Sequence, residues 1–157
     1  MKVIFLDVDG VLNGEQFYNQ CWEKYEYKDV VMQMVLDQQC LLRLFYIIKK
    51  TGAEVVLSSS WRVNHRSFDM VRDQLNFYKI PIYGCTPNNH KSRGEQITEW
   101  LRANPGVEEY VILDDDDGDF SIRGLHGTHY IQTDFTSGLS DSSMNAAINV
   151  LLRDEGK

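Results

Sequence analysis

The sequence predicts an α/β fold in which a parallel β-sheet is covered by helices on both faces. Short apolar runs typical of buried strands alternate with amphipathic helical segments along the chain, a pattern that implies right-handed crossovers. Polar side chains follow three of the predicted strands, and ligands of such sheets bind beyond the carboxyl ends of the strands. These strand ends carry Asp7 and Asp9, Ser58 and Ser59, and Asp114 and Asp115. With 157 residues, 43% of them apolar, the chain is predicted to form one domain over residues 1–157.

The first predicted strand, residues 3–6, delivers two carboxylates to its end. Asp7 and Asp9 are two residues apart, and side chains alternate along a strand, so both are expected to point toward the strand tip. Two like charges held this close repel each other unless a cation or a shared proton relieves them. The alternative is an ordinary Asp-Gly turn with both carboxylates in solvent.

The next segment, residues 14–33, is polar and aromatic with poor periodicity, which predicts a loop that could contain a short helix. A helix is predicted over residues 34–50, with Gly52 as its C-cap. A buried strand over residues 53–57 and a helix over residues 66–78 follow. The apolar stripe of the first of these helices consists of Leu41, Leu44, Phe45 and Ile48.

The second half of the chain continues the alternation of strands and helices. A short strand over residues 80–83 contains Pro81, which suits an edge position, and residues 84–90 are rich in turn formers. Ser92 and Glu95 match a capping box, which predicts the start of a helix. The remaining predicted elements are the end of that helix at residues 104–106, strands over 110–113 and 129–132, and a last helix that begins near Ser140.

Composition limits the classes of function. The net charge of −7 argues against a broad nucleic-acid-binding face, although it leaves room for a local basic pocket. No apolar run approaches the ~20 residues that span a bilayer, and the apolar N-terminus is interrupted at Asp7 and Asp9, unlike a signal peptide. We therefore expect a cytoplasmic protein with no membrane partner and no evident obligate protein partner. Cys21, Cys40 and Cys85 are widely spaced and form no CxxC pair, which indicates reduced thiols.

Aspartates that converge on one edge of a sheet call for a hard divalent cation, and Mg²⁺ suits ligation by carboxylate, water and phosphate. The run over residues 114–119 could instead be a solvated acidic loop, but it directly follows a buried strand. A calcium loop would need an alternating Asp-x-Asp-x-Asp-Gly pattern, which this run lacks. With Mg²⁺ bound, one carboxylate could attack a phosphoryl group while another moves a proton.

A phosphoryl group also needs hydrogen-bond donors. Ser58 or Ser59 could supply a hydroxyl, or either could be an ordinary residue at a strand end. Lys91 and Arg93 flank the start of a helix, where a cation is unfavourable unless an anion is present. The alternative is a solvated pair of surface cations, so the sequence leaves both choices open.

These residues resemble the four motifs of the haloacid dehalogenase (HAD) superfamily. Residues 7–12, Asp-Val-Asp-Gly-Val-Leu, resemble motif I, and residues 113–119, with Asp114, Asp115 and Asp119, resemble motif IV. The serine after the second strand resembles motif II, where the alignment favours Ser59 with Ser58 second. The cation before a later helix resembles motif III, as Lys91 or as Arg93, which would depart from the commoner lysine.

The resemblance implies a three-layer Rossmann-like parallel sheet and a Mg²⁺-dependent phosphatase that forms an aspartyl-phosphate. It implies Asp7 as the nucleophile and Asp9 as the general acid and base. The metal would be held by Asp7, by Asp9 through its carbonyl, and by Asp115, with possible support from Asp114 and Asp119. An aspartate at position 9 favours phosphoryl transfer, because dehalogenating members lack that acid.

A narrower resemblance concerns small HAD domains associated with bacterial and phage RNA-repair systems. It rests on residues 58–62, Ser-Ser-Ser-Trp-Arg, on Thr133-Asp134, and on Gly138-Leu139. The interval from Leu12 to Ser58 is filled by a predicted loop and one predicted helix, so no large cap domain is expected, and an open site would admit a nucleic-acid terminal phosphate. Side chains that could stack on bases or bind phosphates, unless they serve packing, are Trp22, Tyr25, Tyr27, Trp61 and Arg62.

Three other functions compete with this interpretation. A signalling receiver domain also combines acids, a hydroxyl and a lysine around Mg²⁺, but its phosphoacceptor lies on a middle strand, whereas Asp7 follows the first strand. A catalytically silent HAD-like binding module would not need both Asp7 and Asp9. A phosphatase of small metabolites would use the same residues, so the substrate, small molecule or nucleic-acid end, stays open. The GxxxxGK[ST] motif of P-loop kinases does not occur.

Overall fold

The computed structural model describes residues 1–24, 36–121, 123–125 and 127–153. Its centre is a five-stranded sheet with the order β3-β2-β1-β4-β5, in which every neighbouring pair is parallel. The strands are β1 (Lys2–Leu6), β2 (Glu54–Leu57), β3 (Ile82–Cys85), β4 (Glu109–Asp114) and β5 (Tyr130–Gln132). The helices are α1 (Glu15–Lys24), α3 (Gln38–Thr51), η1 (Ser60–Arg62), α4 (His65–Phe77), α5 (Arg93–Ala103) and α6 (Asp141–Leu151). The predicted α/β fold with a parallel sheet is confirmed.

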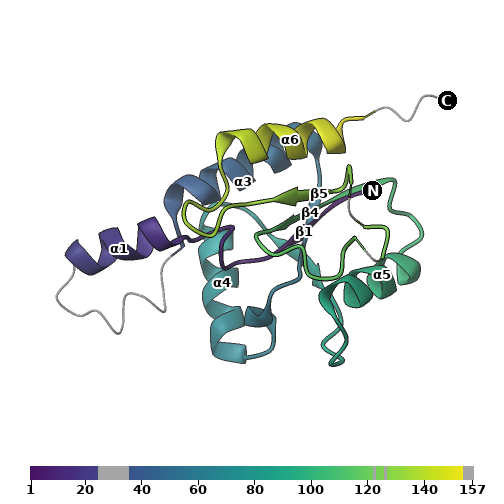
Figure 1. Cartoon of the computed structure of the whole chain (residues 1–157), viewed down its shortest axis with the longest axis horizontal. Coiled ribbons are helices and arrows are strands. Elements are labelled where there is room, and N and C mark those ends of the chain that lie inside the picture. Colours follow the sequence, from purple (N-terminus) through teal and green to yellow (C-terminus); the bar gives the residue numbers. More distant parts are fainter. Residues whose placement is uncertain (25–35, 122, 126, 154–157) are drawn as a thin grey trace.

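Helices cover both faces of the sheet. Successive side chains of the central strand point to opposite faces, so each face carries apolar residues that a helix must bury. Ile4 and Leu6 of β1 pack in one core cluster with buried residues of α3, α4 and α6. Val3 and Phe5 pack in a second cluster with Ile97 and other residues from the α5 side. Figure 1 shows α3 and α6 on one side of the sheet and α5 on the other.

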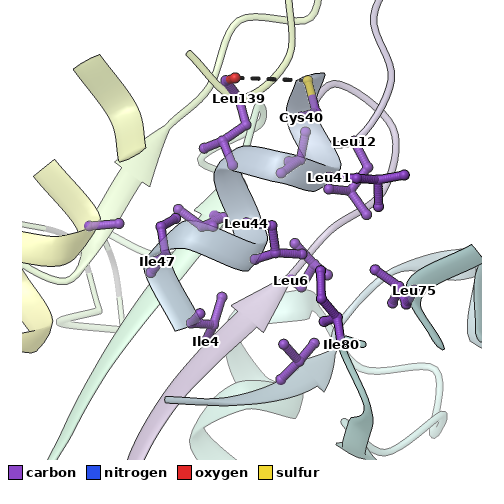
Figure 2. Packing of buried hydrophobic residues seen from close by; sticks show 14 of the residues in the cluster. Ile4, Leu6, Leu12, Cys40, Leu41, Leu44, Ile47, Leu75, Ile80 and Leu139 are labelled. Atoms are coloured by element: carbon purple, nitrogen blue, oxygen red, sulfur yellow. Dashed lines mark hydrogen bonds between the residues drawn. The ribbon is translucent and has the colours of Figure 1, made fainter. Parts of the chain in front are cut away.

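The larger core cluster is built around α3. Figure 2 shows Leu44 and Ile47 of α3 directed toward Ile4 and Leu6 of β1. The side chain of Asp37 caps the helix by accepting from the Gln39 N–H at 2.8 Å. The predicted C-cap is confirmed, since Gly52 has φ +69° and its N–H donates to the Ile48 carbonyl. The helix begins at Gln38, whereas its predicted start at residue 34 lies outside the described residues.

The α5 helix begins and ends where the sequence predicts. Ser92 is the N-cap, and its side chain and that of Glu95 form the reciprocal hydrogen bonds of a capping box. Asn104 is the C-cap, directly before Pro105 and Gly106. Because α5 lies on the opposite face from α3, its N-terminus approaches the carboxyl edge of the sheet from the second side.

The bounds of β3 differ from the predicted ones. The sequence predicts a strand over 80–83 and a turn-rich stretch from residue 84, but β3 continues through Cys85. The register between β2 and β3 shifts after Val55, because β3 carries one extra residue, Tyr83, so that Gly84 and Cys85 still pair with Val56 and Leu57. The edge position is confirmed, and Pro81 lies directly before β3.

The segment between β1 and β2 contains α1 and α3, with no large cap domain among its described residues. The α1 helix has no buried residue and projects from the body of the protein in Figure 1. It occupies part of the region for which the sequence predicts a loop with a possible short helix. Tyr25 and Tyr27 lie outside the described residues. In the described part of the chain, every helix is too short or too polar to cross a bilayer.

Strand register brings three polar strand ends to one level. Leu6 pairs with Leu57 on one side and with Leu113 on the other. The next backbone N–H groups continue the ladders, because Asp7 N donates to the Leu113 carbonyl at 3.0 Å and Ser58 N donates to the Leu6 carbonyl at 2.8 Å. The residues after Leu6, Leu57 and Leu113 therefore lie side by side at the carboxyl edge of the sheet.

Candidate active site

The loop after β1 holds its shape through its own polar groups. Gly10 has φ +72°, a left-handed conformation that favours glycine. Its N–H donates to the Asn13 side-chain oxygen at 3.0 Å, and its carbonyl accepts from the Thr133 hydroxyl at 2.7 Å. A Cβ added at Gly10 would lie 2.5 Å from Cγ of Asp115. The loop thus packs directly against the acidic end of β4.

Three carboxylates converge at this edge of the sheet. Asp7, Asp114 and Asp115 can each place one oxygen so that all three lie within 4.8 Å of one another. Asp7 and Asp114 are buried, with exposed fractions of 5% and 1%. Carboxylate oxygens are the preferred protein ligands of hard divalent cations, so the chemistry of this donor set fits such an ion. Within the described residues, the Asp9 and Asp119 side chains are not members of this group.

The guanidinium of Arg93 lies against two of these carboxylates. Its Nη1 is 3.2 Å from Oδ2 of Asp7 and also donates to Oδ2 of Asp114. Burial raises the pKa of the Asp7 carboxyl, while the nearby Arg93 charge acts in the opposite direction. Burial, together with the neighbouring Asp7 charge, raises the pKa of Asp114 to about 7. One guanidinium balances one of the two buried charges, which leaves the site able to accept a further cation.

The structure places the two candidate cations in different positions. Arg93 is the first residue of α5 and lies at the aspartates, whereas Lys91 precedes the N-cap. The Lys91 ammonium pairs with Glu99 at 2.7 Å, and both side chains are about half exposed. The motif III resemblance leaves Lys91 and Arg93 open as the cation. Of these two, Arg93 is the one that lies at this edge of the sheet.

The two candidate serines also differ in direction. The Ser59 side chain hydrogen-bonds to the Asp7 carboxylate, an interaction that lowers the pKa of Asp7. Ser58 instead accepts a hydrogen bond from the Thr86 hydroxyl at 3.4 Å in a buried position. Of the two serines, Ser59 is thus the one whose hydroxyl contacts Asp7.

Asp9 has partners of its own. Oδ2 of Asp9 accepts from the indole N–H of Trp61 at 2.7 Å, and Oδ1 accepts from the Asn13 amide at 2.9 Å. The same Asn13 amide also donates to the Tyr18 hydroxyl. Neither contact is predicted from the sequence, in which Trp61 is a candidate for base stacking or packing and no pattern singles out Asn13. The Arg62 side chain also points into the protein. Its guanidinium donates hydrogen bonds to the carbonyl oxygens of Ser59, Thr86 and Pro87 and to Oε1 of Gln96.

Asp119 joins the acidic loop to the start of α5. Its Oδ1 accepts from the Gly94 N–H at 2.8 Å, and its Oδ2 accepts from the Ser92 hydroxyl and from Arg123. A carboxylate at this position also interacts favourably with the helix dipole. Asp119 therefore supports the site by holding the helix that carries Arg93.

The chain matches a known protein family. The family described as "HAD domain in Swiss Army Knife RNA repair proteins" matches residues 3–144 of the chain. The matched span includes every candidate site residue from Asp7 to Asp119. A search of curated proteins finds no match.

Proposed function

Because the chain belongs to the family of HAD domains found in Swiss Army Knife RNA repair proteins, and so to a superfamily of hydrolases, we propose that it is a Mg²⁺-dependent phosphatase. The reaction passes through an aspartyl-phosphate at Asp7. One observation carries the proposal: the register of β1, β2 and β4 brings Asp7, Ser59 and Asp114 to one edge, where Arg93 joins them.

In the first step, a carboxylate oxygen of Asp7 forms a bond to phosphorus as the bond from phosphorus to the leaving oxygen breaks. Asp9 donates a proton to that leaving oxygen, which departs as an alcohol. In the second step, Asp9 takes a proton from water as the water oxygen attacks the phosphorus. The bond between phosphorus and Asp7 breaks, which releases inorganic phosphate and restores both carboxyl groups.

Ser59 and Arg93 hold the non-bridging oxygens of the phosphoryl group in this proposal. The position of Arg93 at the first turn of α5 adds the favourable field of a helix N-terminus. Asp7, Asp114 and Asp115 would hold Mg²⁺, with the Asp9 carbonyl as the additional ligand that the family resemblance implies. The ion would offset the negative charge that gathers when a phosphate meets three carboxylates.

A nucleic-acid terminal phosphate is the substrate class that the family supports. The family description places such domains in RNA repair proteins, and no large cap lies over the site in the described part of the chain. A small phosphorylated metabolite is the second candidate, because the same residues would act on its phosphate. In either case the protein is expected to act as a cytoplasmic enzyme without a membrane partner.

Hydrolysis of p-nitrophenyl phosphate tests the proposed chemistry. The wild-type protein should release p-nitrophenol with Mg²⁺ and lose this activity with EDTA, and Asp7→Asn should be inactive in both conditions. Equal activity of wild type and Asp7→Asn would overturn the assignment. Formation of a stable phosphoprotein without turnover would favour a receiver-like module, and the absence of any Mg²⁺-dependent chemistry would favour a silent binding module.

A substrate screen then tests the proposed substrate class. Oligonucleotides with 3′- or 5′-terminal phosphates should be hydrolysed with a higher kcat/KM than mononucleotides or sugar phosphates. A strong preference for sugar phosphates would contradict the nucleic-acid end and favour the metabolite phosphatase.

A further inference from the structure

The Asp9 carboxylate is held at both of its oxygens by uncharged donors. The Trp61 indole reaches Oδ2 at 2.7 Å, and the Asn13 amide reaches Oδ1 at 2.9 Å. Each carboxylate oxygen has two lone pairs, so each keeps one for a proton or a substrate. Two donors on opposite oxygens prevent rotation of the carboxylate about its bond to Cβ.

The indole is itself fixed by the end of β2. Trp61 lies in the single turn η1, and the Ser59 hydroxyl caps this turn by accepting from the Trp61 backbone N–H at 3.4 Å. The Arg62 guanidinium anchors the turn to the carbonyls of Thr86 at 3.0 Å and Pro87 at 3.1 Å. The Trp61 side chain also packs against the larger core cluster. The position of the indole N–H is thus set by the same strand end that places Ser59.

The second donor is fixed by the loop after β1. The Gly10 N–H donates to Oδ1 of Asn13, which determines the orientation of the amide and leaves its NH₂ group to face Asp9. Asn13 is thus held by the backbone of the loop that carries Asp7 and Asp9. Trp61 is held by a different strand, 52 residues away in sequence from Asp9.

We propose that Trp61 is a positioning residue for proton transfer by Asp9, its indole N–H fixing Oδ2 so that the free lone pairs of the carboxyl group face the leaving oxygen. The inference rests on the proposed phosphatase function and deepens it. A general acid must come within about 2.6–3.2 Å of the atom that it protonates, and small errors of position are costly in rate. The contribution of Trp61 to kcat/KM should therefore be larger for esters whose leaving oxygen depends more strongly on protonation.

Two other roles for Trp61 make different predictions. If the ring serves packing alone, its replacement should lower activity on all phosphate esters to the same extent. If the ring stacks on a nucleic-acid base, its replacement should raise KM for oligonucleotides and leave simple esters unaffected. Only the positioning role predicts a loss that depends on the leaving group of a small ester.

The decisive comparison is between Trp61→Phe and Trp100→Phe. Phenylalanine keeps an aromatic ring at position 61 and removes the N–H donor. Trp100 provides the matched control, because it packs edge-on against Phe5 on the other face of the sheet, with ring centroids 5.3 Å apart. Thermal unfolding and circular dichroism of both variants establish that they are folded.

The measured quantity is kcat/KM for p-nitrophenyl phosphate, phenyl phosphate and an alkyl phosphate. This ratio reports formation of the aspartyl-phosphate and excludes hydrolysis of the intermediate that all three esters share. Trp61→Phe should lower the ratio for the alkyl ester by about 10²-fold, the size of a general-acid contribution, and have little effect with p-nitrophenyl phosphate. Trp100→Phe should change all three ratios in parallel. Parallel losses in Trp61→Phe, or no loss with any ester, would overturn the inference while leaving the phosphatase assignment intact.

A spectroscopic measurement tests the contact without relying on turnover. The indole N–H signal of Trp61, assigned by its loss in Trp61→Phe, should shift in the ¹H–¹⁵N spectrum when Asp9 is changed to Ala, while the Trp100 signal should not. An unshifted Trp61 signal overturns the inference even in an active enzyme. If the wild-type protein hydrolyses none of the esters or oligonucleotides, the proposed function itself is wrong and the proton-transfer role falls with it.

Discussion

Arg93 lies with its Nη1 3.2 Å from Oδ2 of Asp7, at the level where β1 and β4 end. The same nitrogen contacts Asp114, so one guanidinium joins the ends of both central strands. This arrangement predicts that Arg93→Met lowers kcat/KM for p-nitrophenyl phosphate by about 10²–10³-fold, the effect of removing one donor to a transition-state oxyanion. Arg93→Lys keeps the charge and should retain more activity than Arg93→Met.

Lys91→Met supplies the contrast for this prediction. The Lys91 ammonium pairs with Glu99 on the exposed side of α5, and exposed ion pairs contribute little to stability. Its replacement should leave kcat/KM close to that of wild type. A large loss in Lys91→Met with normal activity in Arg93→Met would contradict the placement of the two cations.

Gly10 provides a second prediction through its contact with Asp115. Gly10→Ala combines an unfavourable left-handed conformation with a Cβ placed 2.5 Å from Cγ of Asp115. Gly52 is a matched control, because it has nearly the same φ, +69°, but a Cβ there meets no atom within 4 Å. Gly52→Ala should cost about 1 kcal/mol of unfolding free energy and leave activity normal.

Gly10→Ala should lower the free energy of unfolding more than Gly52→Ala does. It should also raise the Mg²⁺ concentration for half-maximal activity, since Asp115 must move. Chemical denaturation and Mg²⁺ titration of the two variants measure the two effects separately. Equal Mg²⁺ requirements in Gly10→Ala and wild type would show that Asp115 is not a ligand.

The fold was predictable from sequence because its determinants are local. Each determinant acts over a few residues: the apolar runs, the capping box of α5 and Gly52 after α3. The order of the motifs indicates the HAD superfamily, which the family match confirms. The choice between Ser58 and Ser59 depends instead on side-chain direction at a strand end. The choice between Lys91 and Arg93 depends on which residue follows the N-cap Ser92 and so meets the sheet edge.

The contacts of Asp9 were beyond a sequence-based prediction. The alternation of side chains along a strand predicts that Asp7 and Asp9 point the same way. However, β1 ends at Leu6 and the chain then turns, with the N–H groups of Val11 and Leu12 both donating to the Val8 carbonyl. Asp9 consequently meets Trp61, whereas Asp7 meets Arg93. No local pattern relates Asp9 to a tryptophan on another strand end.

Cys40 predicts a dependence of stability on alkaline pH. Its thiol is fully buried and donates to the Leu139 carbonyl at 3.8 Å, as Figure 2 shows. Burial raises the pKa of Cys40 from 9.0 to about 11. Between these values the unfolded chain loses the proton while the folded protein keeps it, so the stability present below pH 9 is lost as the pH rises through 11.

Denaturation at several pH values, compared between wild type and Cys40→Ala, measures this effect. The variant should be less stable at neutral pH, because it leaves a cavity, but its stability should fall less steeply between pH 9 and 11. Cys40 should also react more slowly with iodoacetamide than the partly exposed Cys21 and Cys85. Equal alkylation of the three thiols in the folded protein would contradict the burial of Cys40.

Thermal stability in the presence of Mg²⁺ tests the metal site independently of activity. An ion that binds only the folded protein stabilises it by about 2.7 kcal/mol at a concentration of 100 times Kd, which corresponds to a rise in Tm of about 5–10 °C for a chain of this size. Wild type should show this rise, and Asp115→Asn should lose most of it, since Asp115 belongs to the group of three convergent carboxylates. Asp117→Asn is the matched control, because Asp117 is an exposed residue of the same acidic run and its replacement removes the same charge. The Mg²⁺-induced rise should persist in Asp117→Asn. If both variants lose the Mg²⁺-induced rise in Tm equally, the rise depends on the overall charge of the acidic run and not on a site built from Asp7, Asp114 and Asp115.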